Sequence, residues 1–206
     1  GNNDTITLPT GTITLSDNLP VISQALHIVG QLMSSTIIDG DSGQFTVFDT
    51  NNTAGLTIEK LTIVAFRDTA IRVIDTDVTL HEVEVDGTDR TLSGTTNPGI
   101  IVRSAGGTHS AQLKNIFMHS LSADGGGVLA LTNHTSSGNG VFQVELENVT
   151  IADINAIGSS DVNTIALGTG NPNATGLLNT EAILKNVTLT NVVSTTGVSN
   201  LLAVPT

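Results

Sequence analysis

The 206-residue sequence contains no cysteine, tryptophan or tyrosine. Without cysteine it has no disulfides, no thiolate metal ligands and no cysteine nucleophile. Its aromatic residues are five phenylalanines, so the ring platforms on which sugars and bases commonly stack are scarce. No apolar run of about 18 residues predicts a membrane span, and no basic and then apolar signal segment opens the chain.

Positive charge is also scarce. Seven Lys and Arg stand against nineteen Asp and Glu, which gives a formal net charge of −12 at pH 7. Because nucleic-acid binding requires a clustered basic patch, we expect no nucleic-acid partner. Thr, Asn, Ser and Gly are plentiful and together make up 86 residues. The composition therefore predicts a surface rich in Thr and Asn around a core supplied by the 38% of residues that are apolar.

Apolar and polar residues alternate along most of the chain, which is typical of β-strands. Clear examples lie at residues 5–8, 12–15 and 56–58. No window of a dozen residues shows helical spacing, and the nearest candidate, residues 19–26, includes Pro20 and two β-branched residues. We expect an all-β protein with almost no α-helix.

Five octads share one pattern, with apolar residues at positions 1, 3, 6 and 8. The alternation breaks once in the middle of each octad, which predicts two short strands that meet at a two-residue bend. Asn115, Asn148 and Asn186 fall at the second bend position. Asparagine tolerates the left-handed backbone of such a corner, and stacked Asn side chains can form a structural hydrogen-bonded ladder. The octads are Leu56–Ile63, Val78–Val85, Ala111–Met118, Val144–Ile151 and Ala182–Leu189.

A third strand is predicted after each octad, following a loop of variable length. These strands are Ala70–Val73, Gly99–Val102, Gly127–Ala130, Thr164–Leu167 and Asn200–Ala203. Three strands per repeat with variable corners predict a single solenoid domain over residues 1–206, a parallel β-helix whose stacked coils bury continuous apolar columns. A β-sandwich is the alternative, but it gives no reason for one octad to recur five times.

The opening of the chain resembles a known family. The segments Asp4–Leu15, Leu26–Gly30 and Thr36–Gly40, followed by the octads, are similar to the first coils of right-handed parallel β-helix surface proteins of the CSLREA-type and polymorphic outer-membrane-protein-like kind. The resemblance implies a right-handed coil and an extracellular or cell-surface location. The Cys-containing hallmark of that family does not occur here, so its role is not carried over. Pectate lyases share the fold, but a shared fold does not imply a shared activity.

An enzyme on this fold would use paired carboxylates, or calcium-binding Asp residues with an Arg or Lys base. Two groups have the residue types, but turn chemistry explains both without a catalytic role. The five His residues lack metal-ligand spacing. We therefore assign no catalytic, cofactor-binding or metal-binding residue, and expect no cofactor. The two groups are Asp68, Asp75 and Asp77 with Arg67 and Arg72, and Asp86 and Asp89 with Arg90 and Arg103.

Six Asn-x-Thr sequons could accept glycans in a glycosylating secretory route. Asn148 and Asn186 already have a structural role in the predicted ladder. Asn51, Asn133 and Asn173 are expected in loops, so they are the candidate acceptors.

Neither end of the predicted solenoid carries a recognisable cap, so either the chain is a segment of a longer protein or neighbouring copies cover its exposed strand edges. We therefore expect a non-enzymatic extracellular structural protein that stacks head to tail as a homopolymer, in a filament, sheath or surface layer. One alternative is an adhesin-like binding module that uses long loops at 86–99, 131–143 and 168–181. The other is a polysaccharide lyase or glycoside hydrolase, which predicts a groove of acidic and basic residues on one strand face.

Overall fold

The computed structural model describes residues 4–41, 46–52, 55–93, 99–124, 126–133, 140–156, 162–169, 178–194 and 199–203. These residues form strands, turns and bends, and none of them is helical. The part of the chain described thus contains no helix long and apolar enough to cross a membrane. The strands are β1 Asp4–Thr7, β2 Gly11–Thr14, β3 Leu26–Val29, β4 Thr36–Asp39, β5 Phe48–Asn51, β6 Leu56–Val64, β7 Ile71–Ile74, β8 Val78–Ser93, β9 Ile100–Ser104, β10 His109–Asp124, β11 Gly126–Asn133, β12 Gly140–Ala156, β13 Val162–Thr169, β14 Leu178–Ser194 and β15 Ser199–Ala203.

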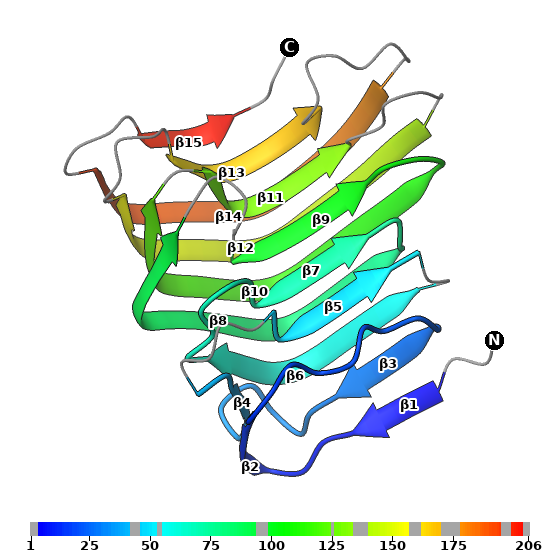
Figure 1. Cartoon of the computed structure of the whole chain (residues 1–206). Coiled ribbons are helices and arrows are strands. Elements are labelled where there is room, and N and C mark those ends of the chain that lie inside the picture. Colours follow the sequence, from blue (N-terminus) through cyan, green and yellow to red (C-terminus); the bar gives the residue numbers. More distant parts are fainter. Residues whose placement is uncertain are drawn as a thin grey trace.

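The strands form two long parallel sheets that face each other, as in a parallel β-helix (Figure 1). The first sheet has the order β1-β3-β6-β8-β10-β12-β14, with β2 and β4 beside it, and the second has the order β15-β13-β11-β9-β7-β5. In Figure 1 the second sheet runs left to right on the near side, β1 and β3 run right to left behind it, and the chain rises from N to C. The coil is therefore right-handed, as predicted.

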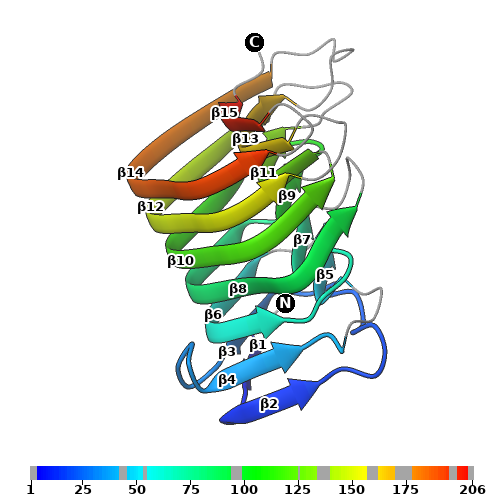
Figure 2. The ribbon, with the colours of Figure 1, turned by 90° about the vertical axis from the view of Figure 1, so that its left-hand side faces the viewer.

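Each coil has the three predicted segments. In the first coils the two halves of an octad are separate strands, because β3 pairs with the first half of β6 and β4 pairs with its second half. In later coils the chain bends without a break in the strand, as in β12 (Figure 2). The third segment is the strand of the second sheet, and β7, β9, β11, β13 and β15 all overlap the predicted positions.

The bend inside each octad has left-handed backbone at one residue. Asn115, Asn148 and Asn186 have φ angles of 53–54°, which few residue types other than glycine and asparagine adopt at low cost. Lys60 and Glu82 occupy the same corner with φ angles of 58° and 55°. A second corner lies five residues later and has no repeated residue type. It is formed by Ala65, Ser120, Asp153 and Asn191, with φ angles of 49–57°.

Inward side chains stack in continuous columns between the sheets. We call one of them the central apolar column, and its members are in direct register from the first coil to the last: Ile6, Ile28, Ile58, Leu80, Leu113, Leu146 and Leu184. The five interior members are at most 5% exposed, whereas Ile6 is 47% exposed and Leu184 is 42% exposed. The core is therefore closed along the sides of the solenoid and open at both ends of the described stack.

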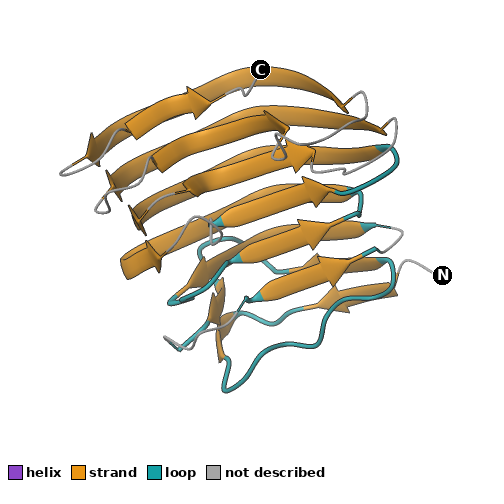
Figure 3. Ribbon diagram, turned by 45° about the horizontal axis from the view of Figure 1, so that its top comes forward, coloured by secondary structure: helices purple, strands orange, loops and turns teal. Residues whose placement is uncertain are grey.

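The three long loops expected from the sequence are shorter than predicted. β8 continues to Ser93, β11 continues to Asn133, β12 begins at Gly140 and β14 begins at Leu178 (Figure 3). The physical reason is that backbone pairing continues past the predicted apolar pattern: after the second corner Leu121 pairs with Arg90, and the ends of β11, β12 and β14 pair with their neighbours, as in Asn133 with Thr169 and Gly140 with Leu178. Residues 94–98, 134–139 and 170–177 lie outside the described residues.

Candidate functional site

The outer face of the first octad segments carries paired charges. Lys114 Nζ lies 3.3 Å from Glu147 Oε1, and Lys185 Nζ donates a 2.8 Å hydrogen bond to Glu145 Oε1. This bond lowers the pKa of Glu145 and raises the pKa of Lys185. Both pairs join neighbouring coils, so the lysine charges on this face are held by acids of the sheet itself.

A polar hollow of about 310 Å³ lies on the same face. Its lining comes from four successive coils, which parallel pairing sets side by side. The volume falls at the lower end of the range for small-ligand sites. The lining residues are Glu59, Thr79, His81, Gln112, Leu113, Lys114, Glu145 and Glu147.

His119 is the centre of a second polar cluster, on the outer face of the later octad segments. Its Nε2 atom lies 2.9 Å from Glu84 Oε1, and its Nδ1 atom lies 3.0 Å from Ser120 Oγ and 3.6 Å from Asp86 Oδ1. The ring stacks on Phe117 with a 4.3 Å separation of centroids. The sequence analysis did not predict this cluster, although aligned octads put Glu84 one coil below Phe117.

The Asn side chains at the octad corner form a ladder along the solenoid. Asn148 Nδ2 donates to Asn115 Oδ1 at 3.0 Å, and Asn186 Nδ2 donates to Asn148 Oδ1 at 3.0 Å. Asn115 Nδ2 continues the ladder to His81 Nε2 at 3.2 Å. These contacts are structural, since they link each corner to the corner of the next coil.

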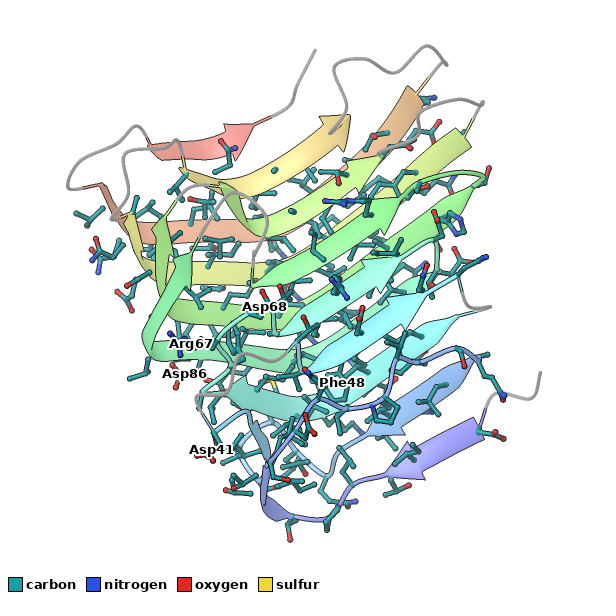
Figure 4. All side chains as sticks on the ribbon, viewed as in Figure 1. Asp41, Phe48, Arg67, Asp68 and Asp86 are labelled. Atoms are coloured by element: carbon teal, nitrogen blue, oxygen red, sulfur yellow. The ribbon has the colours of Figure 1, made fainter. Side chains whose placement is uncertain are left out.

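The first group of acidic and basic residues considered for catalysis makes local structural contacts. Arg72 donates two hydrogen bonds to Asp49, one coil below, and this contact raises the pKa of the guanidinium. Asp68 accepts a 3.0 Å hydrogen bond from Thr46 Oγ1. Arg67 is exposed and lies along the same side of the stack as Asp41 and Asp86 (Figure 4).

Among the remaining members, Asp75 and Asp77 lie in the turn between β7 and β8, whereas Arg103 lies within β9. Asp75 accepts from the backbone N–H of Ala105, and Asp77 accepts from the N–H of Ser110 at 2.7 Å. Asp86 accepts from the N–H of Thr88 at 2.9 Å, within its own turn. Arg103 has a buried Nε atom for which no hydrogen-bond partner is found, and the side chains of Asp89 and Arg90 lie outside the described residues.

No metal-binding cluster occurs among the residues that the structure describes: nowhere do three or more His, Asp or Glu side chains come close enough to hold an ion.

The candidate glycan acceptors differ in accessibility. Asn51 is the last residue of β5 and is exposed. Asn133 was expected in a loop, but it is the last residue of β11 and its side chain is fully buried, with Nδ2 directed at the carbonyl of Gly140. The expected loop position of Asn133 is therefore wrong. Asn173 lies outside the described residues.

The two ends of the described stack expose the most apolar surface. At the first coil an open hollow of about 340 Å³ is lined mainly by apolar residues, among them Ile6, Leu19, Val21 and Phe48. At the last coil the inward-facing Leu184 of β14 is exposed. Exposed apolar surface of this kind is typical of interaction sites, and a strand edge adds unpaired backbone groups.

Comparison of the chain with family models, with curated proteins and with solved structures gives no match.

Proposed function

We propose that the chain is a non-enzymatic structural protein that polymerises by stacking the open ends of its β-helix. The observation that carries the proposal is the central apolar column, which is buried in the interior coils and opens to solvent at Ile6 and at Leu184. A head-to-tail contact between these different ends does not close on itself, so it propagates into a filament, sheath or layer.

The outer faces support a structural role. The two lysines of the first octad face, Lys114 and Lys185, are both held by glutamates of neighbouring coils, and Arg72 is held by Asp49. Cations engaged in this way reinforce the stack between coils and are less available to a substrate.

The proposal includes an extracellular or cell-surface location. This part rests on the resemblance to surface proteins of the CSLREA-type and polymorphic outer-membrane-protein-like kind, and on the Thr- and Asn-rich composition. In a glycosylating host, the exposed Asn51 is the acceptor that the proposal favours.

Cryo-electron microscopy of the folded chain over a range of concentrations tests this function. The proposal expects ordered helical filaments with coil-on-coil contacts between copies. Particles that stay monomeric at every concentration overturn it.

A matched pair of variants on β14 sharpens the test. Leu184→Lys places a charge on the open end of the core and is expected to abolish the filaments. Ile183→Lys adds the same charge one residue away, on the outer face, and is expected to leave them intact. If both variants polymerise equally well, the ends are not the contact.

The polar hollow favours a second candidate, a polysaccharide-acting enzyme. It combines acidic side chains with His81 and Lys114 on one strand face, which is the arrangement expected of such an enzyme. A polysaccharide depolymerisation screen tests this candidate, and activity that is lost in Lys114→Gln and in Glu147→Gln supports it.

A further inference from the structure

We infer that the junction between copies is an in-register continuation of the first sheet. β14 of one copy pairs in parallel with β1 and β2 of the next, so that Ile6 of the next copy lies over Leu184 and Ile13 lies over Leu189. This inference rests on the proposed function and specifies its partner, a second copy of the chain, and its register.

The register follows from the pairing inside the molecule. Every coil of the first sheet continues the same columns, and Leu184 belongs to the column that begins at Ile6. In the later octad half, Leu189 extends the column that contains Ile13 and Ile38. A further coil placed on β14 by the same rule has the inward residues of β1 and β2 above those of β14.

Other registers conflict with the side-chain pattern. A slip of one residue sets Thr5 or Thr7 over Leu184 and turns the apolar set of the strand to the other face. A slip of two residues keeps the inward residues inward but misaligns the corners. The turn between β1 and β2 lies over the corner at Asn186 only in the inferred register. Any other register sets that turn against a straight part of β14.

The outer sides of the junction are electrostatically compatible. The outward residues of β1 and β2 are threonines, namely Thr5, Thr7, Thr12 and Thr14, and all four are exposed. Opposite them the inferred register sets Ile183, Lys185, Thr188 and Thr190 of β14. No like charges face each other there, which matters because each copy carries a net charge of −12.

Asp4 is the exception on the inward side. It begins β1 in the column that continues through Leu26 and Leu56, and the inferred register sets it over the small side chain of Ala182. Covering an unpaired carboxylate opposes association. Asp4→Asn is therefore expected to shift polymer formation to lower protein concentration, whereas Asp17→Asn, made at a residue outside the described strands, leaves it unchanged.

Disulfide cross-linking of polymer tests the register, because the wild-type chain has no cysteine. Neighbouring strands lie about 4.8 Å apart, which suits a disulfide between facing cysteines. The cognate double variants are Thr5→Cys with Ile183→Cys, and Thr12→Cys with Thr188→Cys. All four side chains are exposed, so the substitutions leave the core unchanged.

The controls use the same four substitutions in swapped pairs. Thr5→Cys with Thr188→Cys, and Thr12→Cys with Ile183→Cys, carry equally exposed thiols that the inferred register holds several residues apart. Mild oxidation is expected to give a ladder of covalent multimers from both cognate pairs and from neither swapped pair. Each variant is first examined by electron microscopy for filaments.

The outcomes separate the two proposals. Filaments with no cross-links in the cognate pairs, or with cross-links in a swapped pair or in Thr7→Cys with Ile183→Cys, overturn the register and leave the proposed function standing. No filaments in wild type at any concentration overturn both.

Discussion

The interior coils and the last coil are built from the same octad, yet in the described stack only the interior coils are covered on both sides. Leu113 and Leu184 occupy the same column, but Leu113 is 1% exposed and Leu184 is 42% exposed. The difference comes from the coil above, which Leu113 has and Leu184 lacks in the described stack. In this fold a residue is stabilised by its neighbours along the axis, so identical side chains contribute differently at the ends and in the middle.

The largest expected effect comes from truncating a side chain of the central apolar column in an interior coil. Leu113→Ala leaves a cavity among closely packed neighbours and is expected to lower the free energy of unfolding by about 2–5 kcal/mol. Leu184→Ala, at a concentration where the chain is monomeric, is expected to cost less than about 1 kcal/mol because its side chain is already half in water. Chemical denaturation of the two variants measures both values, and equal losses would contradict the account.

The Asn ladder gives the next largest effect. Asn148→Ala removes two ladder hydrogen bonds and puts alanine at a φ of 54°, which is expected to cost about 2 kcal/mol. Asn148→Gly loses the bonds but suits the backbone, so its cost is expected to be smaller. Asn186→Ala, at the end of the described ladder, is expected to cost less than Asn148→Ala. Thermal unfolding ranks the stabilities of the three variants. If Asn148→Gly were less stable than Asn148→Ala, backbone strain at the left-handed corner would be ruled out as a cause of the loss.

Extending the ladder toward the first coils is expected to stabilise the chain. Glu82 has a φ of 55° at the same corner, one coil below Asn115. Glu82→Asn replaces a residue that is strained there by one that tolerates the angle, for an expected gain of about 0.5–1 kcal/mol. Gln112→Asn, made on a strand, serves as the control and is expected to give no gain. An equal gain from both variants would mean that the corner is not responsible.

The smallest effect concerns the ion pair between β12 and β14. The lowered pKa of Glu145 means that its stabilising contribution is present above the unfolded-state pKa and is lost as pH falls through the folded-state value. The raised pKa of Lys185 means that its contribution is lost as pH rises through the folded-state value. Because the pair is exposed, Lys185→Gln is expected to lower the melting temperature only slightly between about pH 5 and pH 10, and to match wild type at both extremes. A loss as large as that of Leu113→Ala would contradict this view of the outer face.

The sequence was sufficient for most of the fold. The octads predicted which side chains of each strand point into the core, and the break in alternation located the first corner. The Asn residues identified the corner position that has left-handed backbone. The third strands followed from short apolar runs of the kind seen at 100–102. These signals are local and recur in each coil, so they can be read from one chain.

The second corner and the strand that follows it could not be predicted. Ala65, Ser120, Asp153 and Asn191 share a backbone angle but no residue type, so their alignment leaves no pattern in the sequence. The same failure led to the overlong loop at 86–99, whereas the loops at 131–143 and 168–181 were overlong because β11, β12 and β14 extend beyond the predicted apolar pattern. The polar clusters around His119 and His81 depend on contacts between coils 22 to 35 residues apart, which require the register.

Hydrogen exchange of β14 at increasing protein concentration tests the central claim most directly. Half of the backbone groups of this edge strand point away from β12, where the next copy is expected to pair with them. The account predicts that amides within residues 178–194 become protected as concentration rises, while those of β12 keep the same protection throughout. Exchange from β14 that is equally fast at every concentration would contradict the claim that stacked copies complete the end coils.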